Sequence, residues 1–131
     1  MSMYDINEKN LGTFDLVFFF GTIYHLRYPL LALDIISAIC EHELYLESAI
    51  LDDYSPYQGG VGKGYAGSQM IMEFYPGGEF CNNESNWWCP TLYCLLNLVS
   101  ASGFEDVKGL KLTEKPLSLQ LCRGFVTGTK S

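Results

Sequence analysis

The 131-residue sequence has few basic side chains. It contains 8 lysines and arginines against 15 aspartates and glutamates, which gives a formal net charge of −7 at pH 7. Affinity for a phosphate backbone comes mainly from lysine and arginine. This balance argues against nucleic acid as a partner.

Long apolar runs are also missing. The strongest run, Leu16 to Phe20, is far shorter than the ~20 residues that cross a bilayer. The chain does not open with a basic segment followed by an apolar one, as a signal peptide would. We therefore expect a cytoplasmic protein without a membrane segment.

The motifs of metal sites and of covalent catalysis are absent. The five cysteines include no C-x-x-C pair, which favours reduced thiols over a disulfide framework. Cys81, Cys89 and Cys94 match no common zinc spacing, so we expect no metal site. The only histidines are His25 and His42, and no G-x-S-x-G elbow is present, so nothing indicates a nucleophilic serine or cysteine.

Hydrophobic residues make up 48% of the chain and charged residues 18%, which suits a folded core. The near-continuous apolar segment from Asp15 to Gly21 predicts a strand buried on both faces, as in parallel sheets. Pro29 precedes a helix predicted over 30–40, and a second strand follows over 43–51. This order predicts a parallel strand–helix–strand unit and an α/β fold.

The second half of the chain predicts a different order of elements, which ends in an antiparallel hairpin. A short strand is expected over 70–75, and a helix over 90–101 that stops at Gly103. Two strands, over 105–112 and 117–128, follow with a turn between them and predict an antiparallel hairpin at one edge of the sheet.

Five glycines lie between Gly59 and Gly67. A phosphate-binding Walker loop requires serine or threonine after its lysine, whereas Lys63 precedes Gly64 and Tyr65. We expect a mobile surface insertion here.

Candidate site residues follow the first strand. Ligands of open α/β sheets bind beyond the carboxyl ends of the strands, which is the position of Gly21, Thr22, Tyr24 and His25. The alternative is that Tyr24 and His25 only cap the strand and pack on the helix. For the pair Trp87-Trp88, core packing and a wall for an apolar ligand both stay open.

These residues resemble a known motif. The segments Phe14-Asp15-Leu16-Val17, Gly21 to Arg27 and Pro29-Leu30 look like the fourth-strand motif of class I S-adenosylmethionine-dependent methyltransferases. The Tyr24-His25-Leu26 version is similar to the tRNA uridine carboxymethyltransferase branch. Further similarities follow in order: Glu47, Asn86-Trp87-Trp88-Cys89-Pro90, Ser102-Gly103-Phe104 and Arg123-Gly124-Phe125.

The resemblance implies a Rossmann-like fold of which residues 1–131 form a single partial domain, the C-terminal half. The family's glycine-rich cofactor loop and its ribose-binding acid would lie upstream of Tyr4. The function it implies is transfer of a methyl group from S-adenosylmethionine to an unidentified acceptor, for which a small molecule stays open. We expect weak or absent cofactor binding and no activity for the isolated, truncated chain. Action on tRNA is disfavoured by the charge.

The resemblance also implies roles for single residues. Gly21 and Thr22 would contact the cofactor through their backbone, Tyr24 would lie near its carboxylate, and His25 would lie beside Tyr24. Trp87 and Trp88 would border the substrate side. No catalytic residue is identified.

The alternative hypothesis is a non-catalytic α/β interaction module that associates with itself. The segment Leu16 to Phe20, central in the complete fold, would here form an exposed apolar edge. Such an edge invites pairing with another chain, so we expect a homodimer or larger homo-oligomer.

Overall fold

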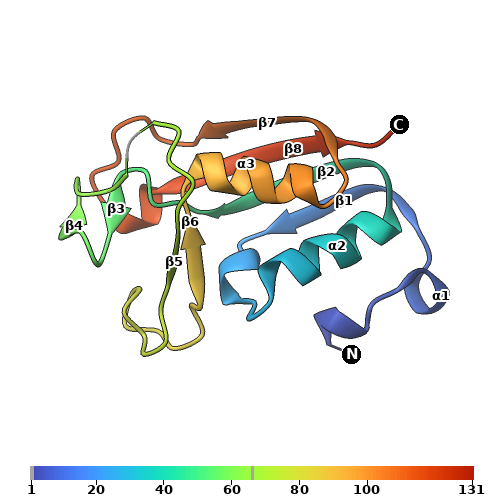
Figure 1. Cartoon of the computed structure of the whole chain (residues 1–131), viewed down its shortest axis with the longest axis horizontal. Coiled ribbons are helices and arrows are strands. Elements are labelled where there is room, and N and C mark those ends of the chain that lie inside the picture. The colour runs from blue at the N-terminus through green and yellow to red at the C-terminus, as the bar shows by residue number, and fades with distance from the viewer. Residues whose placement is uncertain (1, 66) are drawn as a thin grey trace.

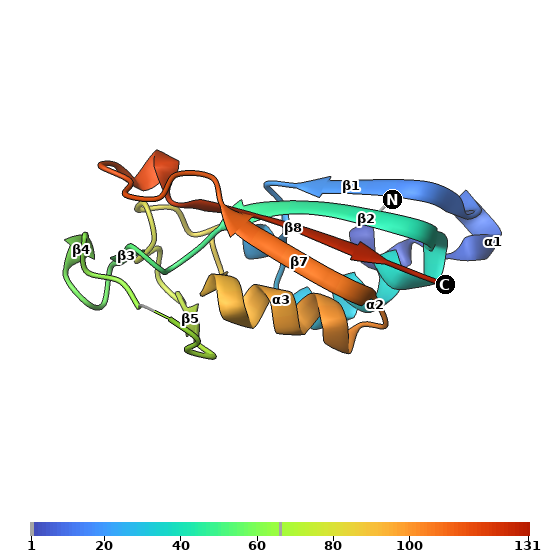
Figure 2. The same ribbon diagram turned by 90° about the horizontal axis from the view of Figure 1, so that it is seen from above.

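The computed structural model describes residues 2–65 and 67–131. Its centre is a four-stranded sheet with the strand order β1-β2-β8-β7. The strands are β1 (Phe14–Phe20), β2 (Cys40–Ala49), β7 (Glu105–Lys111) and β8 (Arg123–Thr129), and the two main helices are α2 (Pro29–Ile39) and α3 (Leu92–Ala101). Figures 1 and 2 show that both helices cover the same face of this sheet. In the described part of the chain, no helix is long and apolar enough to cross a membrane.

Shorter elements surround this centre. Two small antiparallel sheets stand apart from it, one formed by β3 and β4 and the other by β5 and β6. The short elements are η1 (Met3–Asp5), α1 (Glu8–Leu11), η2 (Ile23–His25), β3 (Tyr54–Ser55), β4 (Gly60–Val61), β5 (Met72–Phe74), β6 (Trp88–Pro90) and η3 (Leu119–Leu121).

The predicted parallel unit is confirmed. β1 pairs with β2 in parallel, with Phe18 opposite Tyr45. Pro29 occupies the first turn of α2, where its missing N–H costs no hydrogen bond. The helix passes directly into β2 at Cys40, a few residues before the predicted start of that strand.

The predicted second helix is confirmed with a later start. Pro90 belongs to β6, where it lies opposite Met72, so α3 begins only at Leu92. Thr91 caps the helix, because its Oγ1 accepts a hydrogen bond from the N–H of Cys94 at 3.2 Å. Gly103 has a φ of +108° just beyond the helix end, which confirms the predicted stop.

The predicted edge hairpin is also confirmed, since β8 pairs antiparallel with both β7 and β2. The last strand, however, begins at Arg123 and not at Leu117. The intervening residues form η3, whose turn is closed by a hydrogen bond from the N–H of Cys122 to the carbonyl of Leu119 at 3.0 Å.

The expectation that the first strand is buried on both faces is wrong. Phe19 points toward the helices and is buried, whereas Phe18 is 63% exposed. The reason is that both helices lie on one face of the sheet, and no other helix in the described part of the chain covers the opposite face. β1 does lie at the edge of the sheet, as the resemblance led us to expect.

The main core lies between the sheet and the two helices. Leu33 on α2, Leu44 on β2, Leu95 on α3 and Val126 on β8 are fully buried there. A second buried cluster includes Leu51, Tyr75, Phe80 and Cys89. It anchors the segment that links β2 to α3, which makes this segment part of the packed structure.

The buried carboxylate of Glu73 holds the segment between β2 and α3 in place through hydrogen bonds. It accepts hydrogen bonds from the hydroxyls of Ser55 at 2.6 Å, Tyr65 at 2.7 Å and Tyr75 at 2.9 Å. Burying a carboxylate is costly unless its oxygens are bonded, and three hydroxyl donors meet that need.

The glycine-rich stretch lies at the surface, as predicted, and it is attached to the rest of the chain. Its first part forms the β3–β4 hairpin. At Gly64 a Cβ atom would lie 2.3 Å from the carbonyl oxygen of Leu51, so only glycine allows this close approach. Ala66, which also falls in the stretch, lies outside the described residues.

Candidate functional site

The candidate site lies beyond the carboxyl ends of β1 and β2. Gly21 follows β1 with a φ of +62°, and its N–H donates to the carbonyl of Glu47 at 2.9 Å. A Cβ atom at Gly21 would lie 3.7 Å from both Arg123 Nη2 and Tyr24 Oη. The glycine therefore brings the backbone close to a polar cluster formed by Tyr24, Glu47 and Arg123.

Arg123 is the centre of this polar cluster. Its Nε donates to Oε1 of Glu47 at 3.0 Å, its Nη2 forms an ion pair with the same oxygen, and Nη2 also donates to Tyr24 Oη at 3.2 Å. The guanidinium lies over the Tyr24 ring, 5.1 Å from its centroid. Burial lowers the pKa of Arg123, but the bonds to Tyr24 and Glu47 outweigh it and raise the pKa above its ordinary value.

This bonding pattern leaves two donors for a ligand. Tyr24 Oη accepts from Arg123, so its own proton is free to be donated. Among the described residues, no hydrogen bond uses Nη1 of Arg123. A hydroxyl and a guanidinium N–H beside a glycine backbone suit a carboxylate or a carbonyl oxygen.

His25 is held in a defined tautomer. Its Nδ1 lies 3.0 Å from the carbonyl oxygen and 3.2 Å from the hydroxyl oxygen of Ser85. That hydroxyl donates its proton to Oδ1 of Asn83 at 2.8 Å. A carbonyl can only accept, so we assign the proton of the neutral ring to Nδ1. Nε2 then carries the lone pair, which makes this nitrogen available as a base. The ring also packs against Tyr24, with centroids 4.4 Å apart.

A cavity of about 290 Å³ joins these side chains. It is lined by Tyr24, His25, Ala49, Phe80, Cys81, Asn83, Asn86, Leu119, Gln120 and Arg123. Asn86 is 4% exposed and its Nδ2 donates to the carbonyl of Phe80 at 3.0 Å. Its Oδ1 receives no hydrogen bond from the described residues.

Thr22 does not line this cavity. Its hydroxyl donates to the carbonyl of Phe20 at 2.8 Å, which closes the end of β1. Of the four residues predicted after the first strand, the structure therefore brings Tyr24 and His25 together in the cavity and places Gly21 against its polar cluster.

The tryptophan pair lies elsewhere. Trp87 is bonded to the site only through its backbone, whose N–H donates to the carbonyl of Tyr24 at 2.8 Å, and Arg27 lies over its ring at 4.9 Å. Trp88 lines a separate open, apolar groove of about 340 Å³ beside the start of α2, and its Nε1 donates to the carbonyl of Arg27 at 3.1 Å.

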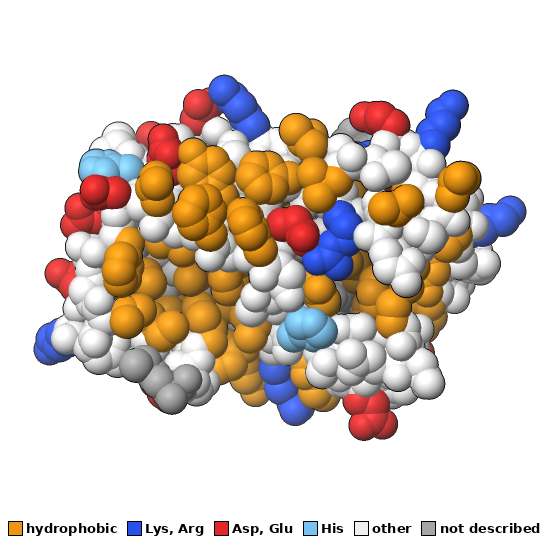
Figure 3. Space-filling model, turned by 180° about the vertical axis from the view of Figure 1, so that it is seen from behind, with side chains coloured by type: hydrophobic (Ala, Val, Ile, Leu, Met, Phe, Trp, Pro, Cys, Tyr) orange, Lys and Arg blue, Asp and Glu red, His pale blue; other side chains and the backbone are white. Residues whose placement is uncertain are grey.

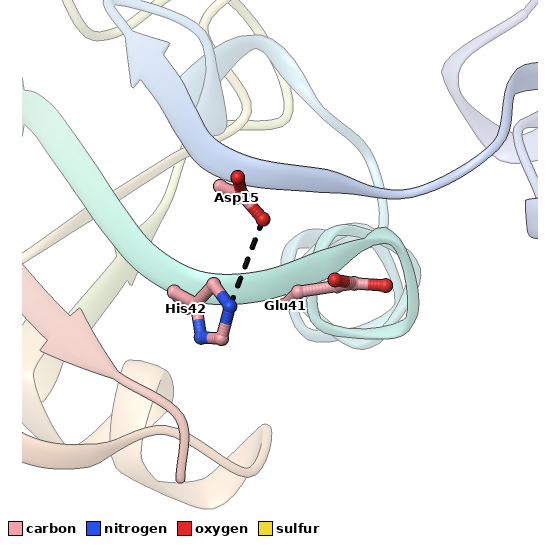
Figure 4. A group of neighbouring side chains, drawn as sticks. All are labelled: Asp15, Glu41 and His42. Carbon is pink, nitrogen blue, oxygen red and sulfur yellow. Dashed lines mark ion pairs between the residues drawn. The ribbon is translucent and has the colours of Figure 1, made fainter.

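The cysteines do not form a metal-binding group among the described residues. The one group of potential ligands there consists of Asp15, Glu41 and His42, shown in Figure 4. A bulge places Glu41 and His42 opposite Asp15, and His42 Nε2 lies 3.6 Å from Asp15. All three side chains are exposed, and they lie at the opposite end of β1 from Gly21, so we assign no metal to them.

Sequence reasoning did not assign roles to several residues of the site. Glu47 and Arg123 entered only as parts of the family resemblance, and Ser85 did not enter at all. The available indication was that an acidic residue lies within the second predicted strand and a basic residue within the last one. The two residues come together only through the pairing of β2 with β8, which sets Ala49 opposite Arg123.

No family model and no curated protein matches the chain. Solved structures do match. The N-terminal domain of EvdMO1 in the presence of SAH and D-fucose has a TM-score of 0.64 at 18% identity, covering 100% of this chain and 53% of that one. A putative O-methyltransferase from Nostoc punctiforme PCC 73102 has a TM-score of 0.60 at 13% identity, covering 98% and 35%.

A third structure, a SAM-dependent methyltransferase from Thermotoga maritima described as a possible histamine N-methyltransferase, has a TM-score of 0.58 at 17% identity. The match covers 100% of this chain and 62% of that one. The chain thus spans about half or less of two of these three structures. At these identities the likeness establishes the fold. The chain has the α/β fold of class I methyltransferases, matched over part of their length.

Proposed function

We propose that this chain is the part of an S-adenosylmethionine-dependent methyltransferase that binds the amino-acid end of the cofactor and lines the acceptor-binding cavity. The observation that carries the proposal is the cluster of Tyr24, Glu47 and Arg123 against Gly21. It lies beyond the carboxyl ends of two parallel strands, where ligands of such sheets bind.

The residues of the cluster fit one end of the cofactor. Nη1 of Arg123 and the hydroxyl of Tyr24 would hold the carboxylate, because both can donate to it. Gly21 leaves room for close approach to the backbone. S-adenosylmethionine, when bound, supplies a methyl group activated by the sulfonium charge.

The fit does not extend to the ribose. Glu47 is already bonded to Arg123, and the glycines over 59–67 do not line the cavity. The proposal therefore includes weak binding and no turnover by the 131-residue chain.

The acceptor would occupy the cavity of about 290 Å³. We propose a small acceptor with a hydroxyl or amine group, since Nε2 of His25, a residue that lines the cavity, can take a proton. The EvdMO1 domain was crystallised in the presence of D-fucose, a small hydroxylated ring. Alignment of donor and acceptor would supply much of the rate.

The narrower likeness to the tRNA uridine carboxymethyltransferase branch rests on the sequence Tyr24-His25-Leu26 alone. It concerns the contact between Tyr24 and the cofactor's carboxylate. The net charge of −7 favours a small acceptor over tRNA.

The test is a nuclear magnetic resonance titration of the chain with S-adenosylhomocysteine up to about 10 mM, a range that detects binding free energies near −4 kcal/mol. We expect shifts at Gly21, Tyr24 and Arg123. The variant Tyr24→Phe keeps the ring and removes the donor, so it weakens the response, whereas Lys63→Gln removes a remote positive charge and leaves the response unchanged. Absence of shifts, or shifts confined to other residues, would refute the proposal.

A further inference from the structure

The face of the sheet opposite α2 and α3 is uncovered and apolar. The strand pairing fixes which residues it presents, because residues directly opposite one another lie on the same face. Phe18 pairs with Tyr45, Glu47 pairs with Phe125, and Leu110 pairs with Phe125. The apolar side chains of this bare face are Leu16, Phe18, Phe20, Tyr45, Leu110 and Phe125, from all four strands.

Four aromatic rings form the centre of the bare face. Phe18 lies 5.4 Å from Tyr45 and 5.6 Å from Phe20, and Phe125 lies 6.0 Å from Phe20 and 6.2 Å from Tyr45, measured between ring centroids. The rings contact one another, and these contacts hold them in place in the absence of a partner. Figure 3 shows hydrophobic side chains gathered over this side of the molecule.

The exposed apolar area lies in the upper part of the range found on monomers. Phe18 and Phe20 are 63% and 50% exposed, and Leu16 and Leu110 are 47% and 55% exposed. A buried aromatic side chain removes about 150–250 Å² from water, so the bare face leaves about 500 Å² of apolar surface uncovered. That is near the top of the ~300–600 Å² typical of the largest patch on a monomer. With a polar rim it approaches the ~800 Å² that each partner buries in a standard interface.

The charges on the bare face nearly balance, although the chain as a whole is strongly acidic. Glu47 is paired with Arg123, and Lys108 lies 3.6 Å from Asp106. Glu43 keeps its negative charge and accepts a hydrogen bond from the hydroxyl of Tyr45. Most of the net charge of −7 therefore lies on other surfaces. Two identical acidic chains can meet at this face with little repulsion, whereas contact through most other surfaces would bring like charges together.

We propose that a second copy of this chain covers the bare face, with the two sheets packed face to face about a two-fold axis. Packed sheets lie about 10 Å apart and interdigitate the side chains between them. Such packing covers all four strands. Pairing of β1 with another β1 would satisfy the sheet edge and leave Phe125 and Leu110 in water. Glu47 and Arg123 belong to this face as well as to the candidate site, so a second copy and a cofactor would compete for this pair. The inference does not rest on the proposed function.

The first experiment measures the mass of the chain in solution by sedimentation equilibrium at micromolar concentrations. We expect a dimer. Phe18→Lys, which places a charge at the aromatic centre, should raise the dimer dissociation constant by about 100-fold, as at the central residues of interfaces. Leu117→Lys is the matched control, because Leu117 is 90% exposed and lies outside the sheet, and it should leave the dimer intact. Circular dichroism of each variant checks that it is folded.

A second variant separates face packing from edge pairing. Leu110 lies on β7, at the opposite edge of the sheet from β1. Face packing predicts that Leu110→Lys weakens the dimer, whereas pairing through β1 predicts no change. A monomeric wild-type chain would overturn the proposal, and so would a dimer that tolerates both Phe18→Lys and Leu110→Lys.

Discussion

Arg123 and Glu47 lie 76 residues apart in the sequence and form an ion pair. Arg123 is the first residue of β8, and Glu47 lies near the end of β2. The side chains are 23% and 25% exposed, so water screens the pair less than it screens a surface pair. The same guanidinium bonds Tyr24, which follows β1. One side chain thus connects β8, β2 and η2 at the candidate site.

We expect this pair to couple in a double-mutant cycle. Arg123→Gln and Glu47→Gln should each destabilise the fold, and the double variant should lose less than the sum, with a coupling of about 1 kcal/mol. Urea denaturation measures all four proteins. A coupling of zero would mean that solvent already compensates each charge.

The tautomer of His25 is a second prediction. Because Nδ1 faces the carbonyl of Ser85, the neutral ring should carry its proton on Nδ1, with Nε2 unprotonated. Long-range nitrogen–proton correlation spectra distinguish the two tautomers. His42, which is exposed, serves as the internal reference, and a proton on Nε2 of neutral His25 would contradict the assignment.

Stability should fall at alkaline pH because of Tyr75. Burial, the nearby Cys89 and Glu73 raise the pKa of its hydroxyl far above the ordinary value. Above about pH 10 the unfolded chain loses this proton and the folded chain keeps it, so rising pH favours unfolding.

Urea denaturation between about pH 8 and 10.5 measures this effect. Tyr75→Phe removes the titrating group, so its stability should fall less steeply with pH than that of the wild type. It also loses the hydrogen bond to Glu73, which should cost about 1 kcal/mol at neutral pH. Equal slopes for the two proteins would show that other groups govern the alkaline limit.

The attachment of the glycine-rich stretch can be tested at two glycines. Gly64→Ala forces a Cβ against the backbone carbonyls of Leu51 and Asp52, at 2.3 and 2.5 Å, and should destabilise the fold by about 3 kcal/mol. Gly60→Ala is the control: a Cβ there meets open space, and only the φ of +103° opposes it, at about 1–2 kcal/mol. Thermal unfolding of both variants gives the comparison. Equal losses would mean that the stretch is not fastened at Gly64.

Local sequence patterns determined the order of the elements. The apolar segment before Gly21, the proline that opens α2 and the glycine that ends α3 act within a few residues, so they could be read without the fold. The parallel unit and the closing hairpin follow from that order, since few connections between such elements are possible.

The faces of the sheet could not be read in the same way. The run Leu16 to Phe20 is apolar on both sides, and its composition is that of a strand between two layers of helices. In the structure only Phe19 and the partly buried Val17 meet the core. Whether a strand face is covered depends on where helices pack, and that depends on the whole chain.

The site shows the same division. The sequence alone placed Gly21, Tyr24 and His25 beyond the end of a strand, because a ligand-binding position in an open sheet follows from strand order. It did not determine that Arg123 would bond both Glu47 and Tyr24, or that Ser85 would fix the tautomer of His25. Those contacts join residues 60 to 99 positions apart. Only the antiparallel pairing of β8 with β2 and the packing of the loop before β6 bring them within hydrogen-bond distance.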